Sequence, residues 1–355
     1  MLKSSEIVKT PSVERLLNLW ARRYTPDISS LLANSLSCDE LLKAATPEGR
    51  TATANKLRDK MLDINCQMGW IQTKNLYSYI PNVLDLSEAR RITKFAFRVY
   101  RRLIEIYQQQ SSKIDIENNS LSQWVIPAVE EFAYALEPIL IIFQEQHVAS
   151  KDWRSLGFMT TQLNFTNKLI LKKLTSVEQA LLAPYFKFVE EQVAIPWQRI
   201  CSNAATYELD SPGLKLVEQM MPSTSDIAES VYRQLIELLP HNRTRRGLLT
   251  EPGIKHSCLR DLNMSQAYIL LCFLEQSMAP IEQELIPLSA MVLEGVEIKW
   301  ELTEKWCELL ASEMESRLDS EQRNFLFPYT QGMKKAFFKE RRSLGYKEDV
   351  IAEIV

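Results

Sequence analysis

Glycine is scarce in this chain, and its scarcity restricts the fold more than any other feature. Only 9 of the 355 residues are glycine, whereas ordinary usage is about 7%. Tight turns between strands and loops that wrap around phosphates rely on glycine, because it adopts positive φ angles at little cost. Neither G-x-x-x-x-G-K-[ST] nor G-x-G-x-x-G occurs in the sequence. The standard nucleotide-binding loops are therefore absent.

Apolar residues recur at intervals of three and four along most of the chain. Clear examples are "SVERLLNLWARRY", "DIAESVYRQLIELLP" and "EGVEIKWELTEKWCELLASEMESRL". This spacing is the periodicity of amphipathic α-helices. The one β signal is the imperfect alternation of "GWIQTKNLYSYI" at 69–80. We therefore expect an all-α, predominantly helical fold, with at most a small β-wing at 69–80.

The composition allows one large or two medium domains. The chain is 46% hydrophobic and 25% charged, which is enough apolar material for a sizeable core. The polar segment "QQQSSKIDIENNS" at 108–120 has the composition of a loop. We predict an N-terminal helical unit at 1–110, a linker at 108–120 and a C-terminal helical domain at 121–355.

The cysteines and the apolar runs bear on the compartment. The six cysteines include no C-x-x-C pair, a pattern typical of reduced thiols rather than of a disulfide framework. The first residues lack the apolar core of a signal peptide. The longest apolar run, Pro138–Phe143, is too short to cross a bilayer. We expect a cytoplasmic protein that does not contact membranes.

The segment at 37–80 divides into two predicted helices joined by a turn. Ser37 and Glu40 have the spacing of a capping box and begin the helix "CDELLKAA". The turn "TPEGR" (46–50) follows, then the helix "TATANKLRDKMLDI" (51–64) and the β-like segment at 69–80. In a winged helix-turn-helix protein, the second helix of such a set enters the major groove of DNA.

The second helix has a polar outer face. Ala54, Leu57, Met61 and Ile64 share one side of it at 100° per residue, which we expect to be buried, and Asn55 lies nearly opposite. Asparagine can pair with adenine, and lysine or arginine with guanine or phosphate. The candidate DNA contacts in this segment are Arg50, Thr51, Asn55, Lys56 and Arg58.

Two observations keep an alternative open. Asp59 and Asp63 share the outer face and would repel phosphates. Thr46 followed by Pro47 is a good N-cap and first helical residue. The second helix can therefore begin at Pro47 and pack as a plain helical hairpin.

In arrangement, 37–80 resembles the winged-helix class. More loosely, the chain resembles the cyanobacterial heterocyst-differentiation regulator family, through this segment and through "EEQVAIPWQRIC" and "PYTQGMKKAFF". That resemblance implies a helical protein that binds DNA and regulates transcription during cell differentiation.

A helix with cations along one face follows. In "SEARRITKFAFRVYRRLIEIY", the apolar residues Ile92, Phe95, Val99, Leu103 and Ile106 form one side, and the opposite arc carries Arg90, Arg91, Lys94, Arg98, Arg101 and Arg102. Like charges at i,i+4 destabilise a helix slightly. A face of one sign therefore indicates an anionic partner, of which phosphate matches the guanidinium best. A protein partner or a solvated face are the alternatives.

A stripe of glutamates near the C-terminus is one candidate for such a protein contact. Its members are Glu294, Glu297, Glu301, Glu304 and Glu308. The stripe can cover the basic helix within one chain or across a homo-oligomer, or it can be a solvated face. A further basic cluster, Lys334, Lys335, Lys339, Arg341 and Arg342, is typical of a solvated terminal hairpin.

No motif for catalysis or metal binding stands out. The three histidines, His147, His241 and His256, match neither a zinc finger nor a Glu-x-x-His pair, and no G-x-S-x-G elbow occurs. We expect no enzyme activity, no cofactor and no metal. The leading hypothesis is a DNA-binding transcriptional regulator with a helical protein-interaction domain. The alternative is a helical adaptor or scaffold that does not bind nucleic acid.

Overall fold

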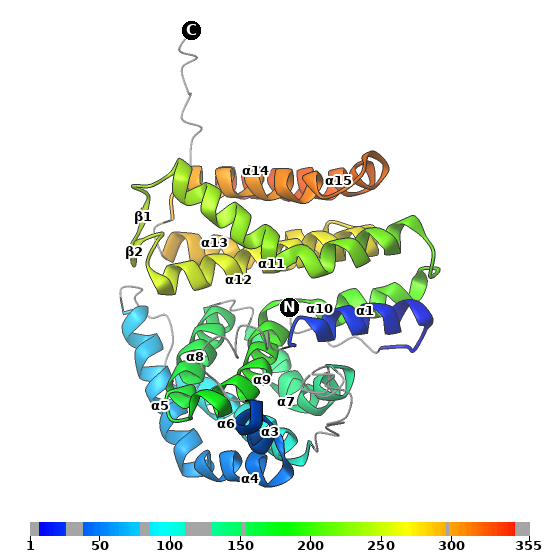
Figure 1. Ribbon diagram of the computed structural model, residues 1–355. Helices are drawn as coiled ribbons and strands as arrows, with labels where there is room; N and C mark the ends of the chain where they lie inside the picture. Colours follow the sequence, from blue (N-terminus) through cyan, green and yellow to red (C-terminus); the bar gives the residue numbers. More distant parts are fainter. Residues whose placement is uncertain are drawn as a thin grey trace. The chain divides into compact units, whose positions relative to one another are not determined.

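The computed structural model describes residues 7–25, 38–78, 86–110, 129–150, 154–295 and 298–344. Most of these residues are helical, which confirms the all-α fold (Figure 1). The chain divides into two compact units, Met1–Leu209 and Asp210–Val355.

The division lies far beyond the linker predicted at 108–120. The helices that follow residue 128 pack against those that precede residue 110, so the first unit continues to Leu209. Residues 111–120 of the predicted linker lie outside the described part of the chain.

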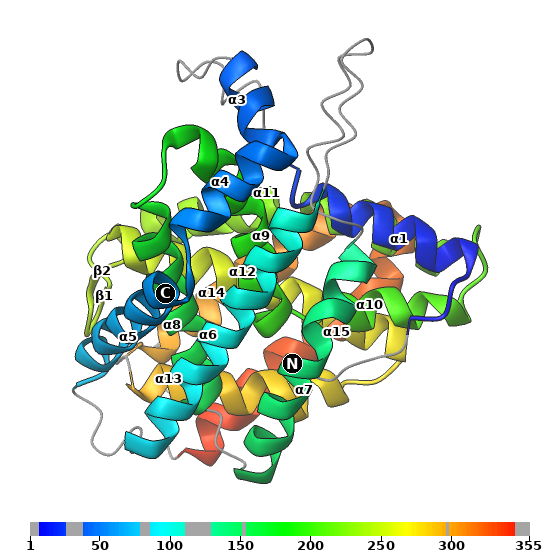
Figure 2. The ribbon, with the colours of Figure 1, turned by 90° about the horizontal axis from the view of Figure 1, so that it is seen from below.

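Unit 1 is a bundle of helices. They are α1 (Pro11–Arg22), α3 (Cys38–Ala45), α4 (Pro47–Lys56), α5 (Asp59–Leu76), α6 (Leu86–Gln109), α7 (Val129–Ser150), α8 (Arg154–Leu171), α9 (Ser176–Ala194), α10 (Trp197–Asn203) and the short 3₁₀ turn η2 (Ala204–Thr206). Helix α6 packs against α4, α5, α7, α8 and α9 and is the centre of the unit (Figure 2).

Unit 2 consists mainly of long helices. They are α11 (Pro212–Leu238), α12 (Pro252–Glu275), the π-helical turn η3 (Ile281–Leu285), α13 (Ile286–Gly295), α14 (Trp300–Ser316) and α15 (Ser320–Ser343). Strands β1 (Arg243–Thr244) and β2 (Gly247–Leu248) form an antiparallel pair between α11 and α12. It is the one sheet among the described residues.

Side-chain caps set the starts of several helices. The Thr10 hydroxyl accepts a hydrogen bond from the Val13 amide, with Pro11 as the first helical residue. Thr175 and Glu178 form a complete capping box at α9. Such caps satisfy amides that have no partner within the helix.

The predicted β-wing is wrong. Gly69 to Leu76 belong to α5, and the last residues of the predicted wing, 79–80, lie outside the described part. The reason is visible in Leu62, Cys66, Gly69 and Thr73, which are buried and spaced four, three and four apart. This spacing places them on one side of a helix, and α8 packs closely against α5.

The turn and the recognition helix also differ from the prediction. Helix α4 begins at Pro47, with the Thr46 hydroxyl accepting from the Gly49 amide, so the predicted turn residues 47–50 are helical. The predicted helix 51–64 is interrupted at Leu57 and Arg58, whose backbones leave the helical region. Because of this break Ile64, which was expected on the buried side, is exposed. Residues 38–76 form three consecutive helices. The second of them begins at Pro47, as the hairpin alternative expected.

Candidate nucleic-acid interface

Helix α6 exposes a row of cations to solvent. Arg90, Lys94, Arg98 and Arg101 are exposed and follow one another at intervals of four, four and three residues. Ile92, Phe95, Val99 and Leu103 on the opposite side are buried, and Ile106 is half-buried. The division into a buried and a basic face is therefore confirmed. From Arg90 to Arg98 the row extends about 12 Å along the helix.

Three cations of this face take part in local ion pairs. Arg91 binds Glu88. Arg102 lies 3.2 Å and Arg101 3.4 Å from the carboxylate of Glu105. These pairs join exposed or half-exposed groups of one helix, where each contributes only a few tenths of a kcal/mol.

The other three cations of the face, Arg90, Lys94 and Arg98, have neither an ion pair nor a side-chain hydrogen bond within the described part of the chain. Lys94 lies four residues from each of the other two, so the row repels itself. Six cations against Glu88 and Glu105 leave the helix a local charge of +4. Helix stability does not explain this row, and an anionic ligand would relieve the repulsion.

The start of α5 lies at one end of the basic face. The Nε of Arg101 is 4.0 Å from a carboxylate oxygen of Asp59. Arg58 immediately precedes Asp59 in the chain and Asn55 lies three residues before Arg58. Both are exposed, and the Arg58 guanidinium donates to the Asn55 side-chain oxygen at 3.4 Å. These two predicted contacts thus adjoin the basic face.

The prediction that Arg50 contacts DNA is wrong. Arg50 is 2% exposed. Its guanidinium donates to the carbonyl oxygens of Ala45 and Tyr107 and to the Tyr185 hydroxyl, and it lies over the ring of Tyr107. Ala45 and Tyr107 lie in the last turns of α3 and α6, where carbonyls lack helical partners and carry negative partial charge. Arg50 therefore caps two helices from inside the core.

The remaining predicted contacts on α4 are Lys56, which binds a residue of α9, and Thr51. Lys56 is exposed, but its ammonium group lies 2.8 Å from the Glu178 carboxylate, which also accepts from the Thr53 hydroxyl. Burial raises the pKa of Glu178, whereas bonds from Lys56 and the Thr175 cap lower it, and the net pKa is lowered. Thr51 is half-buried. Lys56 therefore has a partner within unit 1, and Thr51 is only partly accessible.

The glutamate stripe contacts the C-terminal basic cluster within unit 2. Glu304 binds Arg341, and Glu308 lies 2.9 Å from Lys305 and 3.7 Å from Lys334. The contacts with Arg341 and Lys334 join α14 to α15, which are packed against each other, whereas Lys305 is on α14 itself. The Glu304–Arg341 and Glu308–Lys334 pairs therefore contribute to the α14–α15 hairpin.

The other members of the stripe are Glu294, Glu297 and Glu301, and in the described part of the chain they do not extend the contact between α14 and α15. Glu301 is exposed. Glu294 lies at the end of α13, before α14 begins, and its side chain, like Glu297, is outside the described part.

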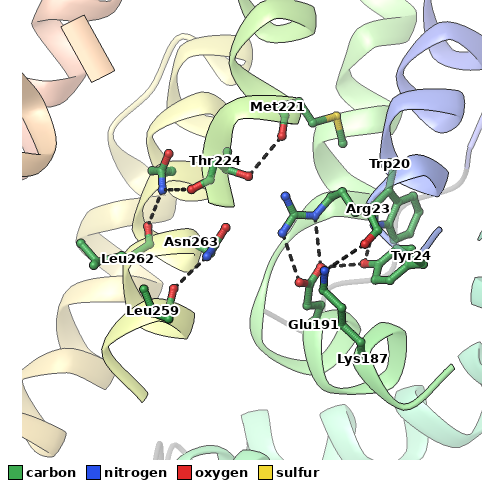
Figure 3. Close-up of polar contacts among 11 residues, drawn as sticks. Trp20, Arg23, Tyr24, Lys187, Glu191, Met221, Thr224, Leu259, Leu262 and Asn263 are labelled. Atoms are coloured by element: carbon green, nitrogen blue, oxygen red, sulfur yellow. Dashed lines mark hydrogen bonds and ion pairs between the residues drawn. The ribbon is translucent and has the colours of Figure 1, made fainter. Parts of the chain in front are cut away.

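Sequence reasoning missed a buried ionic cluster between α1 and α9 (Figure 3). The Arg23 guanidinium donates twice to Glu191, and the Tyr24 hydroxyl donates to the same carboxylate at 2.8 Å. The Trp20 indole in turn donates to the Tyr24 oxygen. Burial raises the pKa of Glu191, whereas the charges of Arg23 and Lys187 and the hydrogen bonds from Arg23 and Tyr24 lower it. The net effect is a lowered pKa. Glu191 stands between Glu190 and Gln192 in the sequence, so no local signal marked its carboxylate as buried.

Neither metal ligands nor membrane spans appear in what is described. No group of three or more His, Cys, Asp or Glu residues there has the geometry to hold a metal ion. Among the same residues, no helix combines the length and the apolar character needed to traverse a bilayer. Comparison of the chain with protein-family models, with curated proteins and with solved structures gave no match.

Proposed function

We propose that the protein is a DNA-binding transcriptional regulator whose contact surface is the basic face of α6. The observation that carries the proposal is the row of Arg90, Lys94 and Arg98, exposed and without a partner among the described residues. Phosphates on one DNA strand recur every 3.4 Å or so along the duplex axis. A straight row of cations on a rigid helix can therefore neutralise several of them at once.

Base readout would come from the neighbouring residues Asn55 and Arg58. Both are exposed beside the start of α5, and both side chains form base contacts in known protein–DNA complexes. Asp59 and Asp63 are exposed in the same region and oppose close approach there. Phosphate binding by α6 is thus the stronger part of the proposal, and it does not depend on a winged-helix fold.

A salt titration with a labelled duplex of random sequence tests this directly. Neutralising four phosphates gives a slope of about −3.6 in log affinity against log salt, and roughly 10²-fold weaker binding at 200 mM than at 50 mM. Replacing Arg90, Lys94 and Arg98 by Gln should reduce the slope by about 2.7. Helix content should not change, because none of the three is buried.

A matched control removes the same charge elsewhere on unit 1. Arg22, Lys43 and Lys172 are exposed on or beside three different helices, and their replacement by Gln should leave the slope nearly unchanged. Equal losses in the two triple variants would mean that net charge, rather than the α6 face, controls binding. Absence of duplex binding by the parent chain at low salt would refute the proposal.

One observation favours the alternative, a helical adaptor. Helix α5 exposes Ile64, Met68 and Ile71, and aligned apolar residues on a surface are typical of protein contacts. If the parent chain does not bind duplex DNA, this row becomes the main functional surface of unit 1.

A further inference from the structure

Helix α5 carries an exposed row of large apolar side chains. Ile64, Met68 and Ile71 are 47%, 43% and 41% exposed. Their spacing of four and three places them in one line along the helix. The opposite side of α5 is already packed in the bundle through Leu62 and Cys66. Within the part of unit 1 that the structure describes, the row therefore has no role in the core.

The spacing of the row indicates a helix as its partner. Positions four and three apart form the a/d seam of a coiled coil, in which each apolar side chain inserts between residues of a facing helix. A second copy of the chain presents the same seam. Closed symmetric dimers are also the commonest oligomers of soluble proteins.

The row is centred on α5, so two copies of the helix can pair around a two-fold axis. Helix α5 runs from Asp59 to Leu76, so Met68 lies near its midpoint. In an antiparallel pair centred there, each Ile64 meets Ile71 of the second copy, and the two Met68 side chains meet at the axis. The Ile64–Ile71 contact then occurs once on each side of the axis.

Charges beside the row specify the antiparallel direction. Asp63 and Lys74 are exposed and lie on the same flank of the row, about 20° apart around the helix. Within one helix they are roughly 16 Å apart and cannot pair. In an antiparallel pair, equal flanks face each other, and Asp63 falls opposite Lys74 of the second copy. Symmetry gives this ion pair twice.

A parallel pair lacks these contacts. It would bring the charged flank against the other flank, where Met61, Asn65 and Gln72 carry no charge. Lys60 also lies on the charged flank, one turn from Asp63 of its own helix, so the carboxylate lies between two ammonium groups in the antiparallel pair.

We propose that two copies of this protein associate through α5, antiparallel, along Ile64, Met68 and Ile71 and with reciprocal Asp63–Lys74 ion pairs. The seam is short, and one helix pair buries less than the roughly 1,200–2,000 Å² of a standard stable interface. The association is therefore weak and concentration-dependent. It does not depend on DNA binding.

Sedimentation of the full-length chain over a range of concentrations, without DNA, tests the proposal. The parent should shift from monomer to dimer as concentration rises, and Ile64→Lys with Ile71→Lys should remain monomeric. The matched control is Ile142→Lys on α7, because Ile142 is 48% exposed but lies on another helix. It should dimerise as the parent does. A parent that stays monomeric, or a control that loses the dimer equally, overturns the proposal.

A charge exchange tests the antiparallel direction. Asp63→Lys or Lys74→Asp alone should weaken the dimer several-fold, and the two together should restore it, since the pair is re-formed with reversed sign. Failure of the double variant to recover what the single variants lose overturns the antiparallel arrangement. A monomeric parent whose melting temperature falls in the Ile64/Ile71 variant would instead assign the row to a contact within one chain.

Discussion

Replacing Arg50 with methionine should destabilise unit 1 strongly, although the residue lies in a polar stretch of sequence. Methionine keeps most of the buried volume of the arginine stem and removes the cation. The guanidinium donates to Ala45 at 3.1 Å, to Tyr107 at 3.4 Å and to Tyr185 at 3.3 Å. The first two acceptors are carbonyls at the C-terminal ends of α3 and α6.

The magnitude follows from these contacts. Each buried carbonyl left without a donor costs about 1–3 kcal/mol. A partly buried cation at a helix C-terminus contributes up to about 2 kcal/mol. Because these contributions overlap, we expect Arg50→Met to lower the free energy of unfolding by about 3–5 kcal/mol. The free energy of unfolding of Arg50→Lys should lie between those of the parent and Arg50→Met, because lysine keeps the charge but not the planar set of donors.

Urea unfolding followed by circular dichroism measures the change, and hydrogen exchange localises it. Amides near the ends of α3 and α6 should lose protection. Arg58→Met is the control, since Arg58 is exposed and such surface changes are usually within about 0.5 kcal/mol. A variant at position 50 within about 1 kcal/mol of the parent would refute the capping role. If Arg50→Met kept the stability of the parent but lost duplex binding, Arg50 would instead be a DNA contact.

Three further changes test the packing and the charge row. Glu191→Gln should cost about 3–5 kcal/mol at neutral pH, because Arg23 is left buried without its counter-charge. The pKa of Glu191 is lowered in the folded chain, so this difference in urea unfolding should persist above the ordinary carboxyl pKa and vanish as pH falls through the lower folded value. Lys94→Glu should raise stability in thermal melts by about 0.5–1 kcal/mol, since two i,i+4 repulsions become attractions, while it weakens duplex binding. Gly69→Ala should cost about 1–3 kcal/mol, because the new methyl group meets the Thr166 hydroxyl of α8, and Thr166→Ala should relieve part of that loss.

The helical character of the chain and the buried face of α6 follow from apolar spacing, because a period of 3.6 residues is a local property of the sequence. The position of Arg50 does not follow, since its acceptors include Tyr107, which is 57 residues away in the chain. No proline or glycine marks the break at Leu57, which is 1% exposed. A buried leucine at that point is a tertiary requirement, and local propensity cannot reveal it.

The glutamate stripe shows what more careful sequence reasoning could have found. Helices α14 and α15 are separated by only three residues, 317–319, and so short a connection makes neighbouring helices antiparallel. In such a hairpin Glu304 and Glu308 approach Arg341 and Lys334, as observed. The buried Arg23–Glu191 pair had no comparable clue, because 168 residues separate its members.

The two proposed surfaces of unit 1 lie on neighbouring helices, and this proximity has a thermodynamic consequence. Helices α5 and α6 pack against each other, so a dimer formed through α5 carries two α6 basic faces related by the two-fold axis. If one duplex contacts both faces, DNA binding stabilises the dimer, and the dimer strengthens DNA binding by the same factor. The Ile64/Ile71 variant should then weaken duplex binding although it keeps every cation of α6, whereas the triple α6 variant should dimerise normally without DNA. Equal duplex affinity of the parent and the Ile64/Ile71 variant would show that the two surfaces act independently.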